Sequence, residues 1–164
     1  MILTMAEEPL ASEGKVQAVV EAVKGVKPDM AVVPVVFRPS PQQPLEGRRV
    51  AFFCTAPSTS EMLLRRHLEE ECGCRVEMFS GNLSNRSELR ADLARPEMDR
   101  VDTVVTEIKA AAIDVVVEEA AVRGIDVVFA DNLPVEAAPE RVGRLAEVAE
   151  ELGRLARGRF ESRT

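Results

Sequence analysis

The chain has no tryptophan, no tyrosine, one histidine and three cysteines in 164 residues. With so few aromatic rings it lacks the stacking platform that proteins use to hold single-stranded nucleic acid. Its net charge of −7 also argues against general nucleic-acid binding, because phosphate backbones require a basic surface. Three cysteines are too few for a disulfide scaffold, which favours a reducing compartment.

Long apolar runs are missing as well. The longest, such as residues 31–37, have the length of a strand and are too short to span a bilayer. The N-terminal MILTMAEEP has neither a basic region nor the long apolar core of a secretory signal. These absences predict a cytoplasmic protein that binds neither membrane nor nucleic acid.

Residues 1–37 have the pattern of a strand–helix–strand unit. Apolar strands are predicted near Ile2 and at 31–37, and both are expected to be buried. Ser12 is a candidate N-cap for the helix between them, which Gly25 is expected to end. Its expected buried stripe consists of Val16, Val19, Val20 and Val23. Residues 38–48 are rich in proline and glutamine, which predicts a linker.

A second series of strands and helices follows, which is typical of an α/β fold. Strands are predicted at 50–54, 75–79, 103–106 and 126–130, and helices at 61–71, 86–94, 110–123 and about 139–157. The helix near the C-terminus is expected to point Leu145, Val148, Ala149, Leu152 and Ala156 inward. We expect a Rossmann-like doubly wound parallel sheet of about four strands in the order 2-1-3-4. The predicted domains are residues 1–45 and 46–164.

In that strand order, a crevice forms beyond the carboxyl ends of the first and third strands of this series. The loop after the first strand, TAPSTS, brings hydroxyl groups such as those of Thr55 and Ser58 to the start of a helix, which suits an anion. The ordinary alternative is helix capping by Ser58 or Ser60.

The loop after the second strand, SGNLSNR, leads into a helix with Asn85 as a candidate N-cap. Arg86 and Arg90 lie one turn apart, so their guanidinium groups face the same side and are suited to a phosphate or carboxylate. Ion pairing with Glu88, Asp92 or a neighbouring loop is the alternative.

The third strand ends in Thr106, Glu107 and Lys109, at the predicted crevice. An ammonium group there is suited to neutralising phosphate charge during phosphoryl transfer, and Glu107 to orienting Lys109 or binding a metal. The alternative is a Glu107–Lys109 pair that closes the start of the next helix.

Other candidates lie at two further strand ends. Asp131 and Asn132 follow the fourth strand, where they are suited to a hydroxyl, a metal or a base, or to capping a turn before proline. Glu7 and Glu8 follow the first strand of the chain and are suited to Mg²⁺ held through water, or to a solvated loop.

The remaining cysteine and histidine residues offer little chemistry. The spacing of Cys72 and Cys74 does not match C-x-x-C redox or zinc sites, so a partial metal site with His67 is less expected than packing. His67 lies in an acidic stretch and is predicted to be solvated, which leaves a Ser-His-Asp triad without support.

Several segments, taken in order over residues 1 to about 135, resemble the C-terminal part of the cyclic 2,3-diphosphoglycerate synthetase family. They are LTMAEEPLASEGKV (3–16), VVPVVFRP (32–39), RRVAFFCTAP (48–57), SGNLSNRSELRADL (80–93), TEIKAAAIDVV (106–116) and VVFADNLPV (127–135).

The resemblance implies an ATP-dependent ligase that requires Mg²⁺. The family joins the two phosphates of 2,3-diphosphoglycerate into an intramolecular phosphoanhydride and releases ADP and phosphate. A P-loop nucleotide domain precedes this part in the family, whereas this sequence contains no G-x-x-x-x-G-K-[ST]. Residues 1–45 are then expected to be the last strand–helix–strand of that domain, and ATP and Mg²⁺ to bind mainly through the portion that is not present here.

The resemblance also implies an anionic substrate, for which Arg86, Arg90, Lys109 and the 55–58 loop are the expected ligands. Arg38, beside the linker, is placed to reach across the domain boundary. The alternatives are a non-catalytic Rossmann-type module for ligand binding or assembly, and a small enzyme of another α/β family. Exposed strand edges are expected to favour association between copies.

Overall fold

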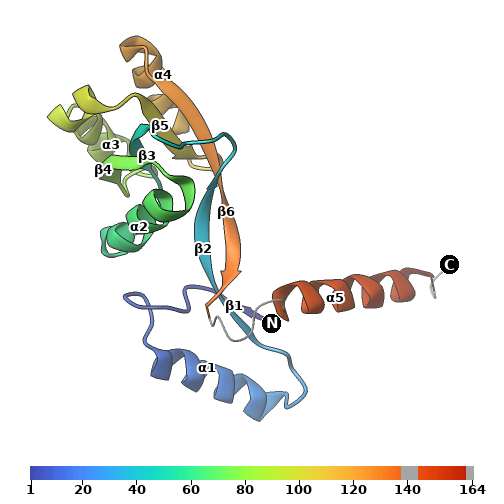
Figure 1. Ribbon diagram of the computed structural model, residues 1–164. Coiled ribbons are helices and arrows are strands. Elements are labelled where there is room, and N and C mark those ends of the chain that lie inside the picture. Colours follow the sequence, from blue (N-terminus) through green and yellow to red (C-terminus); the bar gives the residue numbers. More distant parts are fainter. Residues whose placement is uncertain (138–143, 162–164) are drawn as a thin grey trace. The chain divides into compact units, whose positions relative to one another are not determined.

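A computed structural model describes residues 1–137 and 144–161 (Figure 1). The strands are β1 (Ile2–Leu3), β2 (Val33–Pro41), β3 (Arg49–Phe53), β4 (Arg75–Ser80), β5 (Thr103–Glu107) and β6 (Asp126–Glu136). The α-helices are α1 (Glu13–Val26), α2 (Glu61–Cys72), α3 (Arg86–Leu93), α4 (Ile113–Arg123) and α5 (Arg144–Glu161). Two short 3₁₀ helices, η1 and η2, span Ser58–Ser60 and Pro96–Arg100.

The fold is of the α/β class. Its strands form one mixed sheet in the order β1-β2-β6-β5-β3-β4. The pairs β3–β4, β3–β5 and β5–β6 are parallel. The order β4-β3-β5-β6 confirms the predicted 2-1-3-4 arrangement and the Rossmann-like fold class.

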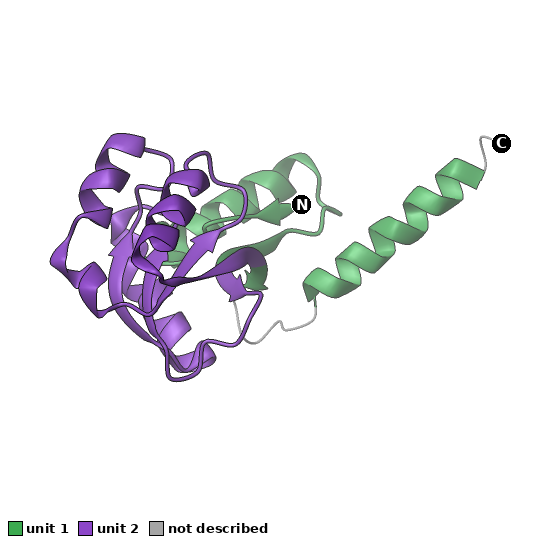
Figure 2. Cartoon of the chain, turned by 90° about the horizontal axis from the view of Figure 1, so that it is seen from above, with its two compact units in different colours: residues 1–37, 134–164 green, residues 38–133 purple. Residues whose placement is uncertain are grey.

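The described residues divide into two compact units (Figure 2). Unit 1 comprises residues 1–37 together with those from 134 onward, and unit 2 comprises residues 38–133. Both β2 and β6 contribute residues to each unit. The domain boundary near residue 46 stays a prediction.

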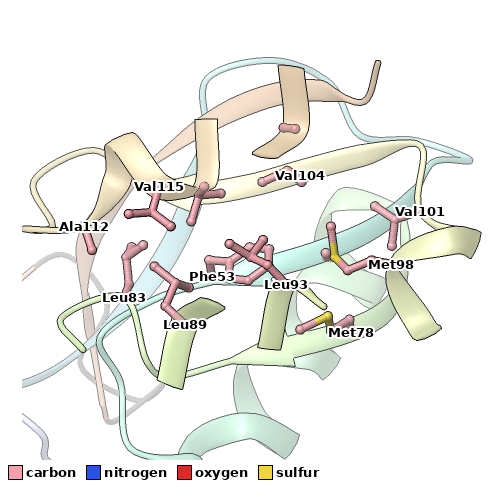
Figure 3. Close-up of a cluster of buried hydrophobic side chains, with 13 residues drawn as sticks. Phe53, Met78, Leu83, Leu89, Leu93, Met98, Val101, Val104, Ala112 and Val115 are labelled. Carbon is pink, nitrogen blue, oxygen red and sulfur yellow. The ribbon is translucent and has the colours of Figure 1, made fainter. Parts of the chain in front are cut away.

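Unit 2 is built around β3, whose side chains alternate between two hydrophobic clusters. Ala51 and Phe53 pack on one face of the sheet with the buried leucines of α3 and the buried valines of α4 (Figure 3). Val50 and Phe52 pack on the other face with Leu64 and Leu68 of α2, as the period of two in a strand requires. Apolar burial on both faces explains why the strand is almost continuously hydrophobic.

The ends of the helices in unit 2 follow local rules. The side chain of Asn85 accepts hydrogen bonds from the backbone amides of Ser87 and Glu88, which confirms it as the N-cap of α3. At the other end, α2 and α4 each terminate at a glycine in the left-handed region, Gly73 and Gly124.

Unit 1 contains the expected strand–helix–strand unit, with β1 and β2 paired in parallel. The Ser12 side chain accepts a hydrogen bond from the Lys15 amide, so the predicted N-cap of α1 is confirmed. The predicted burial is confirmed for β2, where Val33 and Val35 are buried, but it is wrong for α1 and β1. Helix α1 has no buried residue, Val19 is 37% exposed, and Ile2 of β1 is 52% exposed. Helix α1 also continues one residue beyond Gly25, to Val26.

The burial predicted for the helix near the C-terminus is wrong in the same way. No residue of α5 is buried, and Leu152 is 59% exposed. The predicted start near residue 139 lies outside the described residues. No described helix combines the length and apolarity needed to cross a bilayer.

Two other boundaries differ from the sequence prediction because of long-range pairing. Strand β2 extends to Pro41, into the predicted linker, and β6 runs to Glu136 rather than ending at Ala130. The hydrogen bonds from Gln42 N to Phe129 O and from Ala137 N to Pro34 O show antiparallel pairing of β2 with β6, which lengthens both strands. Separately from this pairing, helix α4 begins at Ile113, three residues after the predicted start at residue 110.

Candidate functional site

The candidate site lies at the carboxyl ends of β3 and β5. After β3 the chain enters α2 on one face of the sheet, and after β5 it enters α4 on the other face. Because neighbouring parallel strands send their connections to opposite faces here, the two loops diverge at this edge. This is the edge of the sheet at which the strand order predicts a crevice, and the crevice itself stays a prediction.

Glu107, the last residue of β5, is the centre of a hydrogen-bond cluster. Its Oε2 accepts from the backbone N of Thr55 at 3.0 Å and from Thr55 Oγ1 at 2.9 Å. Its Oε1 accepts from Asn132 Nδ2 at 2.9 Å. The structure therefore brings together three residues that the sequence marked separately, and we call them the Glu107 cluster.

The loop that carries Thr55 is held in place from the side of β4. Cys54 N donates to Ser80 O, and Leu83 N donates to Cys54 O. A Cβ at Gly81 would collide with the carbonyl oxygen of Ala56, so this close approach of the two loops requires glycine. Burial, with a smaller contribution from the charge of Glu107, raises the pKa of the Cys54 thiol to about 12, although a hydrogen bond to the Ala56 backbone opposes the shift.

The loop after β4 is fixed by Asp92 of α3. Asp92 Oδ2 accepts from Ser80 Oγ at 2.6 Å and from Asn82 Nδ2 at 2.8 Å. Ser80 Oγ in turn accepts from the Asn82 amide. The loops after β3 and β4 are thus both held in place by hydrogen bonds.

The two arginines of α3 differ in their contacts. Arg86 Nη2 lies 2.9 Å from both carboxylate oxygens of Asp114 at the start of α4 and also donates to Ala111 O. Arg86 therefore pairs neither with Glu88 nor with Asp92. Its contact with Ala111 agrees with the neighbouring loop that was the third alternative from sequence. The Arg86 guanidinium lowers the pKa of Asp114. Arg90 is exposed, one turn farther along α3.

Lys109 lies in the loop after β5, where its side chain is exposed. Among the described residues no ion pair joins it to Glu107, whose oxygens are occupied by Thr55 and Asn132. Thr106 points into the buried part of unit 2, and its Oγ1 has no hydrogen-bond partner.

Helix capping does not account for the hydroxyl groups of the TAPSTS loop. Ser60 occupies the N-cap position of α2 without a side-chain capping bond, and its buried Oγ has no partner. Ser58 is exposed at the start of η1, which also lacks a side-chain cap. The capping alternative proposed from sequence is therefore wrong for both serines.

Asp131 and Asn132 lie within β6, so the expected turn after the fourth strand is wrong there. Asp131 accepts from Gln42 Nε2 at 3.5 Å, while Asn132 reaches Glu107. Arg38 is half-buried in β2 and has interactions of its own.

Glu7 and Glu8 line a cavity of about 860 Å³ within unit 1, together with Lys24 and Arg144. The described residues contain no group of three or more His, Cys, Asp or Glu side chains placed to hold a metal ion. The two glutamates alone do not make a fitted Mg²⁺ site.

The cysteines and the histidine have structural contacts. Cys74 Sγ donates to Leu68 O, and all three thiols are free. His67 was predicted to be solvated, but it is half-buried with Nε2 3.1 Å from Pro39 O. The solvated assignment is wrong because His67 of α2 contacts Pro39 of β2, which is far away in the sequence.

Sequence reasoning missed Gly81 and Asp92 as parts of the site. Gly81 matters through its collision with a backbone atom from another loop, and Asp92 through hydrogen bonds to residues ten and twelve positions earlier. No local pattern signals either role.

Comparison with known proteins places this architecture in a family. Residues 41–133 match the family model described as "Cyclic 2,3-diphosphoglycerate synthetase C-terminal domain". The chain belongs to this family. The resemblance noted in the sequence is thereby confirmed, and the matched segment contains the whole Glu107 cluster.

Similar relatives carry the same name. The cyclic 2,3-diphosphoglycerate synthetase of Rubrobacter xylanophilus is 47% identical over 154 residues, which cover 94% of this chain and 34% of the relative. Those of Methanothermobacter thermautotrophicus and Methanothermus fervidus are 41% and 42% identical over 135 residues, covering 82% of this chain and 29% of each relative. The chain thus spans about a third of the length of these curated relatives.

Proposed function

We propose that this chain is the C-terminal portion of an ATP-dependent ligase that converts 2,3-diphosphoglycerate into its cyclic phosphoanhydride. The observation that carries the proposal is the position of the Glu107 cluster, at the strand-order reversal and inside the segment that matches the family. The overall reaction joins the two substrate phosphates by one P–O–P bond. Hydrolysis of ATP to ADP and phosphate balances the water that this condensation formally removes.

The proposed roles of the residues follow from the substrate's charge. Two phosphates and a carboxylate require cations and hydrogen-bond donors, because the negative groups repel one another as they approach. Lys109, in the loop after β5, and Arg90, on α3, are both exposed and are proposed to neutralise them. Arg86 forms an ion pair with Asp114, so it would bind a substrate anion only after this ion pair breaks. Ser58 and Thr55 offer hydroxyl donors.

ATP and Mg²⁺ are proposed to bind mainly through a preceding portion with a P-loop, which is also the proposed partner of unit 1. The metal would shield phosphate charge. Because Glu7 and Glu8 do not form a three-ligand site with other described residues, no step is assigned to them.

The alternative is a non-catalytic module for ligand binding or assembly. The contacts of Arg86 with Asp114 and of Glu107 with Thr55 and Asn132 favour it, because each candidate already has partners inside the chain.

The deciding experiment incubates the full-length protein with ATP, Mg²⁺ and 2,3-diphosphoglycerate and follows the reaction by phosphorus NMR. We expect signals of a cyclic phosphoanhydride together with ADP and phosphate. If no cyclic product forms while the protein still binds 2,3-diphosphoglycerate, the module is the better description.

Lys109→Ala tests the proposed cation. We expect kcat/KM to fall about 10- to 100-fold, the range for loss of a hydrogen bond to a charged group. Lys27→Ala, which removes an exposed lysine of unit 1, is the matched control and should leave the rate unchanged. An unchanged rate for Lys109→Ala would remove this residue from the mechanism.

A further inference from the structure

Both carboxylate oxygens of Glu107 are occupied by groups of this chain. Oε2 accepts from the backbone N and from Oγ1 of Thr55, and Oε1 accepts from Asn132 Nδ2. A carboxylate that transfers a proton needs an oxygen within hydrogen-bond reach of the substrate. Three of the roughly four lone-pair sites of this carboxylate are engaged, so direct proton transfer by Glu107 would have to use the one site left on Oε1.

The two bonds from Thr55 do different things. The bond from the backbone N fixes the start of the loop after β3, whereas the hydroxyl is a rotor that can turn to another acceptor. The same loop is held on its other side by the approach of Gly81 to Ala56. Glu107 can thus keep the loop in place while the Thr55 hydroxyl turns to a phosphate oxygen.

Charge separates the roles further. A carboxylate repels a phosphate at short range, so contact between Glu107 and the substrate is unfavourable. The exposed Thr55 hydroxyl is neutral and can donate to either acceptor.

We infer that Glu107 and Asn132 are positioning residues, which act on the substrate by holding Thr55, and that Thr55 donates to a phosphate group. This inference rests on the proposed function. It assigns Asn132 a role through Glu107 in place of the direct contact expected from sequence.

The test is a swap of the carboxylate between positions 107 and 132, measured in the full-length protein. Asn132→Asp alone sets two carboxylates against each other and should raise KM for 2,3-diphosphoglycerate about 10- to 100-fold. Glu107→Gln added to it restores a donor–acceptor pair, because the introduced glutamine can accept from Thr55 and donate to the introduced aspartate. KM should then return to within about threefold of wild type, a strongly non-additive result.

Glu107→Gln alone distinguishes positioning from proton transfer. A glutamine still accepts from Thr55, and Asn132 can turn its amide to match, so kcat and its pH profile should stay close to wild type. If Glu107 transferred a proton, kcat would fall about 10²- to 10⁴-fold and the swap would not restore it. That result would overturn the inference.

Two controls complete the design. Asp126→Asn changes an exposed carboxylate at the start of β6 and should not alter KM. Hydrogen exchange of the Thr55 amide should be faster in Glu107→Ala than in wild type, and equal rates would argue against the bond.

Failure of the proposed function can be distinguished from failure of this inference. If the wild type forms no cyclic product, that function fails. The same variants are then compared by calorimetric titration with 2,3-diphosphoglycerate, where the swap should restore the Kd lost in Asn132→Asp. Absence of this restoration, or of wild-type binding, would overturn the inference.

Discussion

Unit 2 buries its apolar side chains from both faces of its sheet, whereas unit 1 leaves most of its helical apolar side chains exposed to solvent. Phe53 and Leu89 of unit 2 are fully buried, while α1 and α5 of unit 1 contain no buried residue. Both units contain strands and amphipathic helices, so secondary structure does not explain the difference. A helix contributes stability mainly when its apolar face is covered, and only unit 2 covers its own.

The two units also carry different functional proposals. The family match ends at residue 133, the last residue of unit 2, and the Glu107 cluster lies entirely within that unit. Unit 1 offers instead a cavity with mixed charges and exposed valines and leucines. Such apolar exposure is typical of a surface that binds another protein region, which agrees with the proposed P-loop portion as its partner.

The largest expected effect tests the core. Phe53→Ala should lower the free energy of unfolding by about 3–5 kcal/mol, because the side chain is fully buried and leaves a cavity. Val19→Ala in α1 should change it by no more than about 0.5 kcal/mol. Urea unfolding followed by circular dichroism measures both. Similar losses for the two variants would contradict the contrast between the units.

Glycine substitutions are expected to have the next largest effect on the free energy of unfolding, lowering it in unit 2 and raising it in unit 1. Gly81→Ala should destabilise the protein by about 1–3 kcal/mol, since the new methyl group collides with Ala56 O. Gly153→Ala in α5 meets open space and should add up to about 1 kcal/mol of helix stability. The same unfolding assay applies. A neutral Gly81→Ala would show that the loops after β3 and β4 separate easily.

The smallest effect concerns the amino end of the sheet in unit 2. Partial burial of Asp102 would by itself raise its pKa. Hydrogen bonds from the Arg49 side chain, from Thr103 and from the Arg49 backbone lower it below the ordinary 3.8. This contribution to stability is present above about pH 4 and is lost as the pH falls through the lowered pKa.

Arg49→Gln should therefore raise the pKa of Asp102 and reduce stability at pH 7 but not at pH 2. Carboxyl NMR titration measures the first effect and urea unfolding at the two pH values measures the second. Arg66→Gln, at an exposed position of α2, is the control. An Asp102 pKa that does not move would show that Arg49 is not the cause.

The sequence predicts unit 2 well because its rules are local. Alternating strands and helices determine the order β4-β3-β5-β6, and Asn85 caps α3 through its own neighbours. That order brings the carboxyl ends of β3 and β5 side by side, so the meeting of Thr55 with Glu107 follows as well.

The errors arise where distant segments meet. The full length of β6 depends on pairing with β2, almost ninety residues away in the contact of Gln42 with Phe129. Because sequence patterns do not reveal that pairing, they predict that Asn132 lies in a turn, whereas in the structure it lies in β6 and donates to Glu107. The valine stripe of α1 predicts an amphipathic helix correctly, but periodicity does not tell whether anything covers it.

The unequal hydrogen bonding of Glu107 gives this carboxylate a spectroscopic use. Oε2 accepts two hydrogen bonds and Oε1 accepts one, so the two C–O bonds are polarised to different extents. When the Thr55 hydroxyl turns to a ligand, that imbalance disappears. Isotope-edited infrared difference spectra of the carboxylate stretches would then report arrival of the ligand without any added label on it.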